Sequence, residues 1–129
     1  MRDRPLIAIV DDDASICRAL NRLIRSARMD AEIFSSANEF LEDGESHEPD
    51  CLILDVQMPL MTGLELCNQL AGRKSRIPVI FITAHDDVSA RETASGCGAI
   101  AYLRKPFDDQ VLLDAIAEAL KGHGTPSSR

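Results

Sequence analysis

Several apolar segments of this 129-residue chain end in side chains of the kinds that bind metal ions and phosphate. These are the carboxylates of Asp11, Asp12, Asp13 and Asp55, the hydroxyl of Thr83 and the ammonium of Lys105. If the segments are strands of one parallel sheet, their carboxyl ends share one edge, where such sheets place their ligand crevice. We therefore expect these groups to converge.

The expected cluster suits phosphoryl transfer. Neighbouring carboxylates repel one another unless a cation is present, and oxygen donors without nearby Cys or His favour Mg²⁺. The ammonium of Lys105 and the hydroxyl of Thr83 add a positive charge and a hydrogen-bond donor. Such groups stabilise an in-line transfer of phosphate, with one aspartate as the nucleophile that forms an acyl phosphate. A simpler alternative for Asp13 is that it caps the following helix.

Alternating apolar segments and helical patterns predict an α/β fold. Three of the strand-like segments are apolar throughout, which is typical of strands covered on both faces. Helical periodicity is clearest in the stripe from Ile16 to Ala27 and in the stripe from Val111 to Leu120. The segments expected to form strands are Leu6–Val10, Asp30–Phe34, Cys51–Leu54, Val79–Thr83 and Ala99–Leu103.

Capping patterns place the other helices. Ser36-x-x-Glu39 and Thr62-x-x-Glu65 are capping-box patterns that predict helix starts, and Gly44, Gly72 and Gly122 predict helix ends. Asp86–Ser95 is the weakest of the expected helices because it offers few apolar side chains. Five strands alternating with five helices predict a doubly wound, five-stranded parallel sheet with helices on both faces.

The composition limits the partners. There are 14 Lys and Arg against 21 Asp and Glu, for a net charge of −7, which argues against direct binding of nucleic acid or a polybasic membrane surface. No apolar run approaches the roughly 18 residues of a membrane helix, and Met1–Arg4 lacks a secretory signal pattern. We expect one soluble, cytoplasmic domain.

The cysteines have no metal-binding or disulfide signature. Cys17, Cys51, Cys67 and Cys97 show no C-x-x-C spacing, and the three histidines are scattered. In a cytoplasmic protein this pattern favours four isolated, reduced thiols.

From about Leu6 to Leu120 the chain resembles the receiver domains of two-component response regulators, of the chemotaxis and nitrogen-fixation-regulator types. Taken in order, the motifs are specific, although each is weak alone. They are Asp11-Asp12, Leu54-Asp55-Val56-Gln57-Met58-Pro59, Gly63, Thr83-Ala84, Tyr102 and Lys105-Pro106-Phe107. The resemblance implies a flavodoxin-like fold with strand order 2-1-3-4-5.

The resemblance also implies the chemistry of the site. Asp55 would accept a phosphoryl group from a phosphohistidine on a sensor kinase. Mg²⁺ would be bound by Asp12, Asp55 and the backbone carbonyl of Gln57, with Asp11 binding through water. Lys105 would pair with Asp55 at rest and with a phosphoryl oxygen afterwards.

The same resemblance implies a switch. Thr83 would hydrogen-bond a phosphoryl oxygen, and Tyr102 would move from exposed to buried. These changes would alter the surface of the fourth helix, fifth strand and fifth helix. A cis Lys105–Pro106 bond is also implied. The chain would catalyse its own phosphorylation and dephosphorylation and act on no other substrate.

Two alternatives remain at this point. Asp11-Asp12-Asp13-Ala14-Ser15 also fits the D-x-D-x-[ST] signature of haloacid-dehalogenase-like phosphatases, with Asp11 as nucleophile and Asp13 as general acid, but Asp55 then has no role. A receiver-like interaction module that takes no phosphate is the other alternative.

We expect residues 1–121 to form the receiver domain and residues 122–129 to be a polar tail or the start of a linker. The expected partners are a sensor histidine kinase or phosphotransfer protein, a downstream protein target or an output domain, and a second copy in a phosphorylation-dependent homodimer. The sequence leaves open the identity of the kinase and target, the lifetime of the phosphoryl group, and whether the native chain continues past Arg129.

Overall fold

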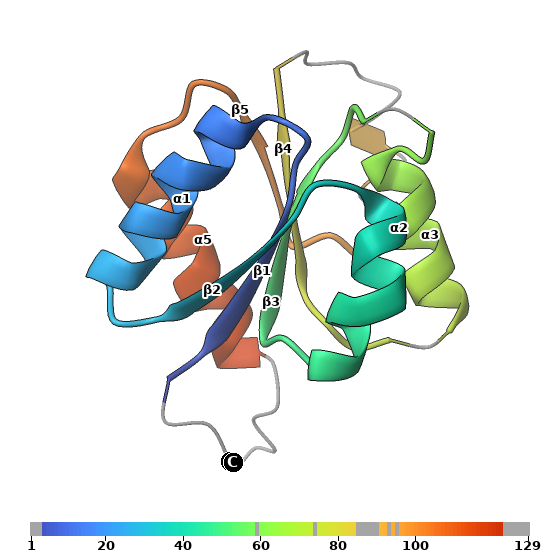
Figure 1. Ribbon diagram of the computed structural model, residues 1–129, viewed down its shortest axis with the longest axis horizontal. Helices are drawn as coiled ribbons and strands as arrows, with labels where there is room; N and C mark the ends of the chain where they lie inside the picture. Colours follow the sequence, from blue (N-terminus) through green and yellow to red (C-terminus); the bar gives the residue numbers. More distant parts are fainter. Residues whose placement is uncertain are drawn as a thin grey trace.

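Five parallel strands form one sheet in the order β2-β1-β3-β4-β5. The computed structural model describes residues 4–58, 60–73, 75–84, 91–92, 94 and 96–122. The strands are β1 (Leu6–Val10), β2 (Asp30–Phe34), β3 (Cys51–Asp55), β4 (Val79–Thr83) and β5 (Ala101–Arg104). This is the doubly wound, flavodoxin-like topology that the sequence predicts (Figure 1).

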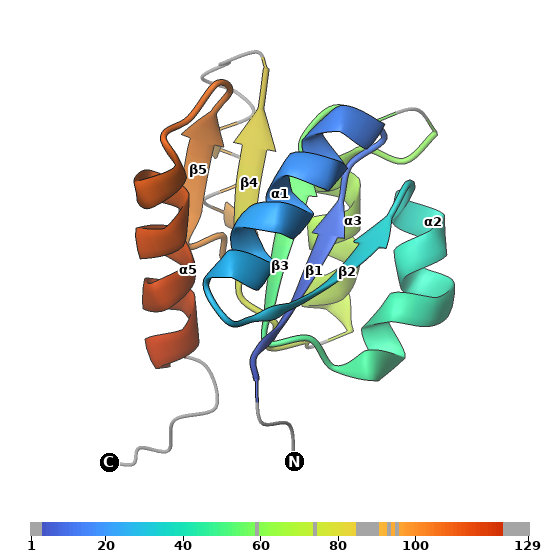
Figure 2. The same ribbon diagram turned by 60° about the vertical axis from the view of Figure 1, so that its left-hand side comes forward.

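Helices cover both faces of the sheet (Figures 1 and 2). Helices α1 (Ala14–Ser26) and α5 (Asp109–Gly122) lie on one face, and α2 (Ala37–Glu39) and α3 (Gly63–Gly72) lie on the other. Helix α2 continues into a π-helical turn, Phe40–Gly44, and a 3₁₀ turn, Glu45–His47.

Side chains of each strand alternate between two apolar cores because successive residues point to opposite faces. In β1, Ile7 and Ile9 pack in the core under α1 and α5, whereas Ala8 and Val10 pack in the core under α2 and α3. Every residue of β1, β3 and β4 is buried, as expected for the three strands that have neighbours on both sides. The edge strand β5 is only partly buried.

Helix starts agree with the capping patterns in different degrees. At Thr62 and Glu65 both reciprocal hydrogen bonds of the capping box form. At α2, the hydroxyl of Ser36 accepts a hydrogen bond from the backbone N–H of Glu39, but the Glu39 carboxylate accepts its bond from Ser35.

The fifth strand begins later than predicted. The prediction of Ala99–Leu103 is wrong by two residues because Gly98 turns at a φ of +90° and places the first hydrogen bond to β4 at Ile100. The predicted helix Asp86–Ser95 lies largely outside the described residues. Of that stretch, Arg91, Glu92 and Ala94 are described, and all three are helical.

The prediction of four isolated thiols is wrong for two of them. A disulfide joins Cys67 on α3 to Cys97, which precedes β5. Thirty residues separate them in sequence, so their spacing carries no signature, but the fold brings their Cα atoms to 6.1 Å. Cys17 and Cys51 are free and buried.

None of the helices in the part of the chain that the structure describes combines the length and apolar character needed to cross a bilayer.

Candidate functional site

The carboxyl edge of the sheet brings three carboxylates together. Asp11 and Asp12 follow β1, and Asp55 is the last residue of β3. One carboxylate oxygen from each lies within 4.8 Å of the others. Asp11 and Asp55 are buried, whereas Asp12 is exposed to solvent. The strand order therefore produces the convergence that the sequence predicts.

Local hydrogen bonds hold the first acidic segment in place. The Oδ1 atom of Asp11 accepts a hydrogen bond of 2.9 Å from the backbone N–H of Asp13. The carboxylate of Asp13 caps α1 by accepting hydrogen bonds from the N–H groups of Ser15 and Ile16. Asp13 thus serves as a helix cap, and Asp11 and Asp12 are left to face the cluster.

Lys105 supplies the positive charge of the site. Its Nζ atom donates a hydrogen bond of 3.0 Å to Oδ2 of Asp11 and lies 3.8 Å from Oδ1 of Asp55. The resemblance implies pairing with Asp55, and this ion pair is present, but the closer partner of Lys105 is Asp11. One ammonium therefore offsets part of the negative charge of both buried carboxylates.

Burial, and after it the negative charge of Asp11, raise the pKa of Asp55 from its ordinary value of 3.8 to about 6. The Lys105 ammonium and the N–H of Gln57, which donates to Oδ1 at 3.3 Å, act in the opposite direction. Burial disfavours the charged form of a carboxyl, and a neighbouring anion adds to this cost. A divalent cation near these oxygens would favour ionisation.

Close packing fixes the start of α3 against Asp55. The N–H of Gly63 donates a hydrogen bond of 2.9 Å to the carbonyl of Val56. A Cβ atom at position 63 would overlap the backbone carbonyl oxygen of Asp55. Glycine is therefore required here by the close approach of α3 to the end of β3.

The ends of β4 and β5 are joined through the backbone. The N–H of Lys105 donates a hydrogen bond of 2.7 Å to the carbonyl of Thr83. The side chain of Thr83 is fully buried at the end of β4. The Lys105–Pro106 peptide bond is cis, as the resemblance to receiver domains implies.

Tyr102 lies half-buried on β5, beside Phe81 of β4, with ring centroids 6.3 Å apart. The guanidinium carbon of Arg91 lies 5.1 Å from the centre of the Tyr102 ring, in a cation–π arrangement. The sequence does not indicate the role of Arg91, because no motif links it to Tyr102. Its position depends on how the segment before β5 folds back over the strand.

The donor set fits a hard divalent cation. All three side chains of the cluster offer carboxylate oxygens. Such ligands suit Mg²⁺, which binds through one or two carboxylates and keeps coordination positions for water and phosphate oxygens. The exposed carboxylate of Asp12 gives the ion a route from solvent.

Comparisons with known proteins show what this chain is similar to. A family model described as the response regulator receiver domain matches residues 7–117. The response regulator protein TodT of Pseudomonas putida is 44% identical over 122 residues, which cover 94% of this chain and 54% of TodT. The chain thus spans about half the length of the curated relatives it matches.

Solved structures show the same fold. A response regulator receiver protein from Burkholderia phymatum is 49% identical, with a TM-score of 0.81 over 92% of this chain and 96% of that one. Full-length FixJ from B. japonicum is 31% identical, with a TM-score of 0.89 over 98% of this chain and 62% of FixJ.

Proposed function

Because this chain belongs to the response regulator receiver domain family, we propose that Asp55 accepts a phosphoryl group from the phosphohistidine of a sensor histidine kinase. The observation that carries the proposal is the cluster of Asp11, Asp12 and Asp55, with oxygens within 4.8 Å and the Lys105 ammonium beside two of them. Asp55 is the member of the cluster that ends the central strand β3.

The chemistry is an in-line displacement at phosphorus. An oxygen of the Asp55 carboxylate attacks, a phosphorus–oxygen bond forms, and the phosphorus–nitrogen bond to the kinase histidine breaks. A pKa of about 6 leaves most of the Asp55 carboxyl ionised, and so nucleophilic, at pH 7. Lys105 is placed to pair with a phosphoryl oxygen once Asp55 carries the group.

We propose Mg²⁺ as the cofactor, bound by Asp12, Asp55 and the backbone carbonyl of Gln57, with Asp11 binding through water. The oxygen-only donor set and the mutual repulsion of the three carboxylates support this assignment. When bound, Mg²⁺ supplies charge stabilisation to the phosphoryl oxygens. The carboxylate of Asp11 already pairs with the Lys105 ammonium, which favours binding of the ion through water and not directly.

We propose that Thr83 and Tyr102 form the switch. The buried Thr83 follows Ile82, whose register partner in β3 is Asp55, and this closeness along the sheet supports a hydrogen bond from its hydroxyl to a phosphoryl oxygen. In the neighbouring strand β5, the register partner of Ile82 is Leu103, and Tyr102 comes directly before it. Movement at Thr83 would change the packing of Tyr102 and so the surface formed by the fourth helix, β5 and α5.

The proposed role is a phosphorylation-dependent switch in two-component signalling, with catalysis limited to its own phosphorylation and dephosphorylation. The expected partners are a sensor histidine kinase or phosphotransfer protein and either a downstream target or an output domain. A homodimer that forms on phosphorylation is a further expectation. The proposed location is the cytoplasm, and the net charge of −7 disfavours direct nucleic-acid binding.

Phosphorylation with acetyl phosphate and Mg²⁺ tests the proposal. We expect mass spectrometry to find one added phosphoryl group, and borohydride trapping with peptide mapping to place it on Asp55. Asp55→Asn should remove the label. Asp43→Asn, a control at an exposed carboxylate away from the cluster, should keep it.

Two results would contradict the proposal. Label on Asp11 in place of Asp55 would favour the phosphatase alternative, although the relatives reported above are response regulators. No label at any residue would favour the interaction module that takes no phosphate.

A further inference from the structure

The disulfide links α3 to the turn before β5, the strand that carries the proposed switch residue Tyr102. Cys67 lies in the middle of α3, and its side chain is buried. Cys97 lies in the turn between the helical residue Gly96 and β5 and is partly exposed. Their Cα atoms are 6.1 Å apart, within the range that a disulfide spans.

One anchor of this link is rigid. Helix α3 starts at Gly63, which packs directly on the Asp55 carbonyl, and its residues Leu66 and Leu70 are buried in the core beneath it. The other anchor, Cys97, precedes Tyr102 by a short segment that includes the turn at Gly98. The disulfide therefore connects the segment that precedes Tyr102 to α3, which packs beside the proposed phosphorylation site.

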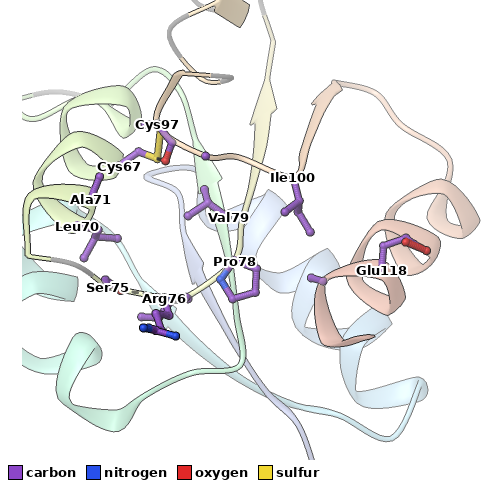
Figure 3. Close-up of a pocket in the computed structure, with 13 residues that line it drawn as sticks. Cys67, Leu70, Ala71, Ser75, Arg76, Pro78, Val79, Cys97, Ile100 and Glu118 are labelled. Carbon is purple, nitrogen blue, oxygen red and sulfur yellow. Dashed lines mark hydrogen bonds between the residues drawn. A yellow bond between two sulfur atoms is a disulfide. The ribbon is translucent and has the colours of Figure 1, made fainter. Parts of the chain in front are cut away.

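A groove of about 510 Å³ opens along the disulfide (Figure 3). Both cysteines line it, together with Arg76, Pro78 and Ile100. Figure 3 shows the sulfur–sulfur bond at one side of this groove. A small disulfide or thiol in solvent can therefore approach the partly exposed Cys97 more readily than the buried Cys67.

The two remaining cysteines differ from this pair. Cys17 and Cys51 are free, and both side chains are buried. Burial also raises the pKa of the Cys51 thiol to about 12, so that it holds little of the reactive thiolate. Among the four cysteines, Cys67 and Cys97 are the pair that the structure joins.

We propose that Cys67 and Cys97 form a reversible redox switch, in which the disulfide restrains the segment before Tyr102 and weakens its response to phosphorylation. The weakened response to phosphorylation rests on the proposed function, whereas the reversible formation of the disulfide does not. Disulfides in reducing compartments are commonly transient and regulatory, which fits the proposed cytoplasmic location.

The oxidant is a low-molecular-weight disulfide, written RSSR. The Cys97 thiolate attacks one sulfur of RSSR, forming a mixed disulfide and releasing one thiolate RS⁻. The Cys67 thiolate then attacks the Cys97 sulfur, which forms the protein disulfide and releases the second RS⁻. Two electrons pass from the cysteines to RSSR, and the two cysteine protons end on two RSH molecules. Excess RSH reverses both steps.

The test compares the 129-residue chain after equilibration with oxidised or reduced glutathione. Thiol alkylation and mass spectrometry should count two fewer free thiols in the oxidised form, with Cys67 and Cys97 joined in one peptide pair. Cys97→Ser should abolish this difference, and Cys51→Ala should keep it. An oxidised chain in which all four thiols still react would overturn the proposal.

Amide hydrogen exchange of residues 96–102, without any phosphoryl donor, measures the restraint alone. We expect exchange to be slower by about tenfold in the oxidised chain and equal in both conditions for Cys97→Ser. Equal exchange in the oxidised and reduced chain would overturn the proposal, whatever the state of Asp55.

Adding Mg²⁺ and beryllofluoride, a phosphoryl mimic, then measures the response of Tyr102 by NMR. We expect its amide shift change to be at least about twofold smaller in the oxidised chain, with Cys97→Ser responding like the reduced chain. Equal responses in both redox forms would overturn the regulatory role. If the proposed function is wrong, the result is different. Acetyl phosphate would then add no phosphoryl group to either redox form, while the difference in hydrogen exchange would persist.

Discussion

The Nζ atom of Lys105 lies 3.0 Å from Oδ2 of Asp11, although 94 residues separate the two in sequence. The same ammonium is 3.8 Å from Asp55. One cation from the end of β5 therefore lies between carboxylates that follow β1 and end β3. This arrangement makes the charge state of Asp55 depend on Lys105, on Asp11 and on any ion bound between them.

Lys105→Met should raise the pKa of Asp55 above its value of about 6. The ammonium favours the ionised carboxyl, and losing an opposite charge at this distance shifts a pKa by about 1 unit or more. Carboxyl NMR titration of the metal-free chain measures the shift. Lys121→Met, at an exposed position on α5, is the control and should leave Asp55 unchanged. An unaltered Asp55 pKa in Lys105→Met would show that the pairing has no electrostatic effect.

Asp55→Asn should stabilise the metal-free chain in a pH-dependent way. Because the folded pKa of about 6 exceeds the unfolded value of 3.8, ionised Asp55 opposes folding. Below pH 3.8 both states are protonated and there is no cost. The cost grows as pH rises to about 6 and is constant above it. The variant should therefore gain about 3 kcal/mol at pH 7 and close to nothing near pH 3.

Urea unfolding across this pH range, in the presence of a chelator, measures that gain. Asp43→Asn, at an exposed carboxylate, should show no such trend. A gain that is the same at pH 3 and pH 7 would mean that the amide acts through packing and not through charge.

Asp12→Asn should weaken Mg²⁺ binding by about tenfold, because the number of charged ligands sets the affinity of an oxygen site. Asp12 is exposed, so the change should leave the metal-free melting temperature nearly unaltered. Isothermal titration calorimetry gives the affinity, and the rise of the melting temperature with Mg²⁺ gives an independent value. Equal affinity in the variant and the parent would remove Asp12 from the proposed ligands.

Gly63→Ala should destabilise the chain by about 3 kcal/mol, since the new Cβ would overlap the Asp55 carbonyl and force α3 away from β3. Gly72→Ala is a matched control at the end of the same helix, because a Cβ there meets no atom within 4 Å. Its effect should be neutral or slightly stabilising. Chemical denaturation compares the two, and similar losses in both would contradict the steric argument.

Reducing the Cys67–Cys97 disulfide should lower the free energy of unfolding by about 2–4 kcal/mol, because the link closes a loop with a sequence separation of 30. Denaturation with and without a reductant measures the difference. In Cys97→Ser the reductant should have no effect. A reductant effect that persists in this variant would point to a different disulfide.

The strand ends could be predicted from the sequence because they follow from topology. Asp55 and Thr83 come directly at the ends of apolar segments, and parallel strands put such ends at one edge. The preference of Lys105 for Asp11 could not be predicted, since a long side chain with several rotamers chooses between neighbours only in the finished fold. The pairing of Cys67 with Cys97 could not be predicted either. Helix α3 follows β3 and the turn at Cys97 precedes β5, so the two cysteines become neighbours only when β3, β4 and β5 have formed the sheet.

Helix α5 runs from the edge of the sheet that carries Lys105 to the opposite edge, where β1 begins (Figure 2). Its 14 residues, at 1.5 Å each, extend about 21 Å. A chain segment attached after Gly122 would start a full helix length away from the carboxylate cluster. Phosphorylation of Asp55 would therefore affect such a segment through a rigid-body shift of α5 or through contacts between the segment and the side of α5.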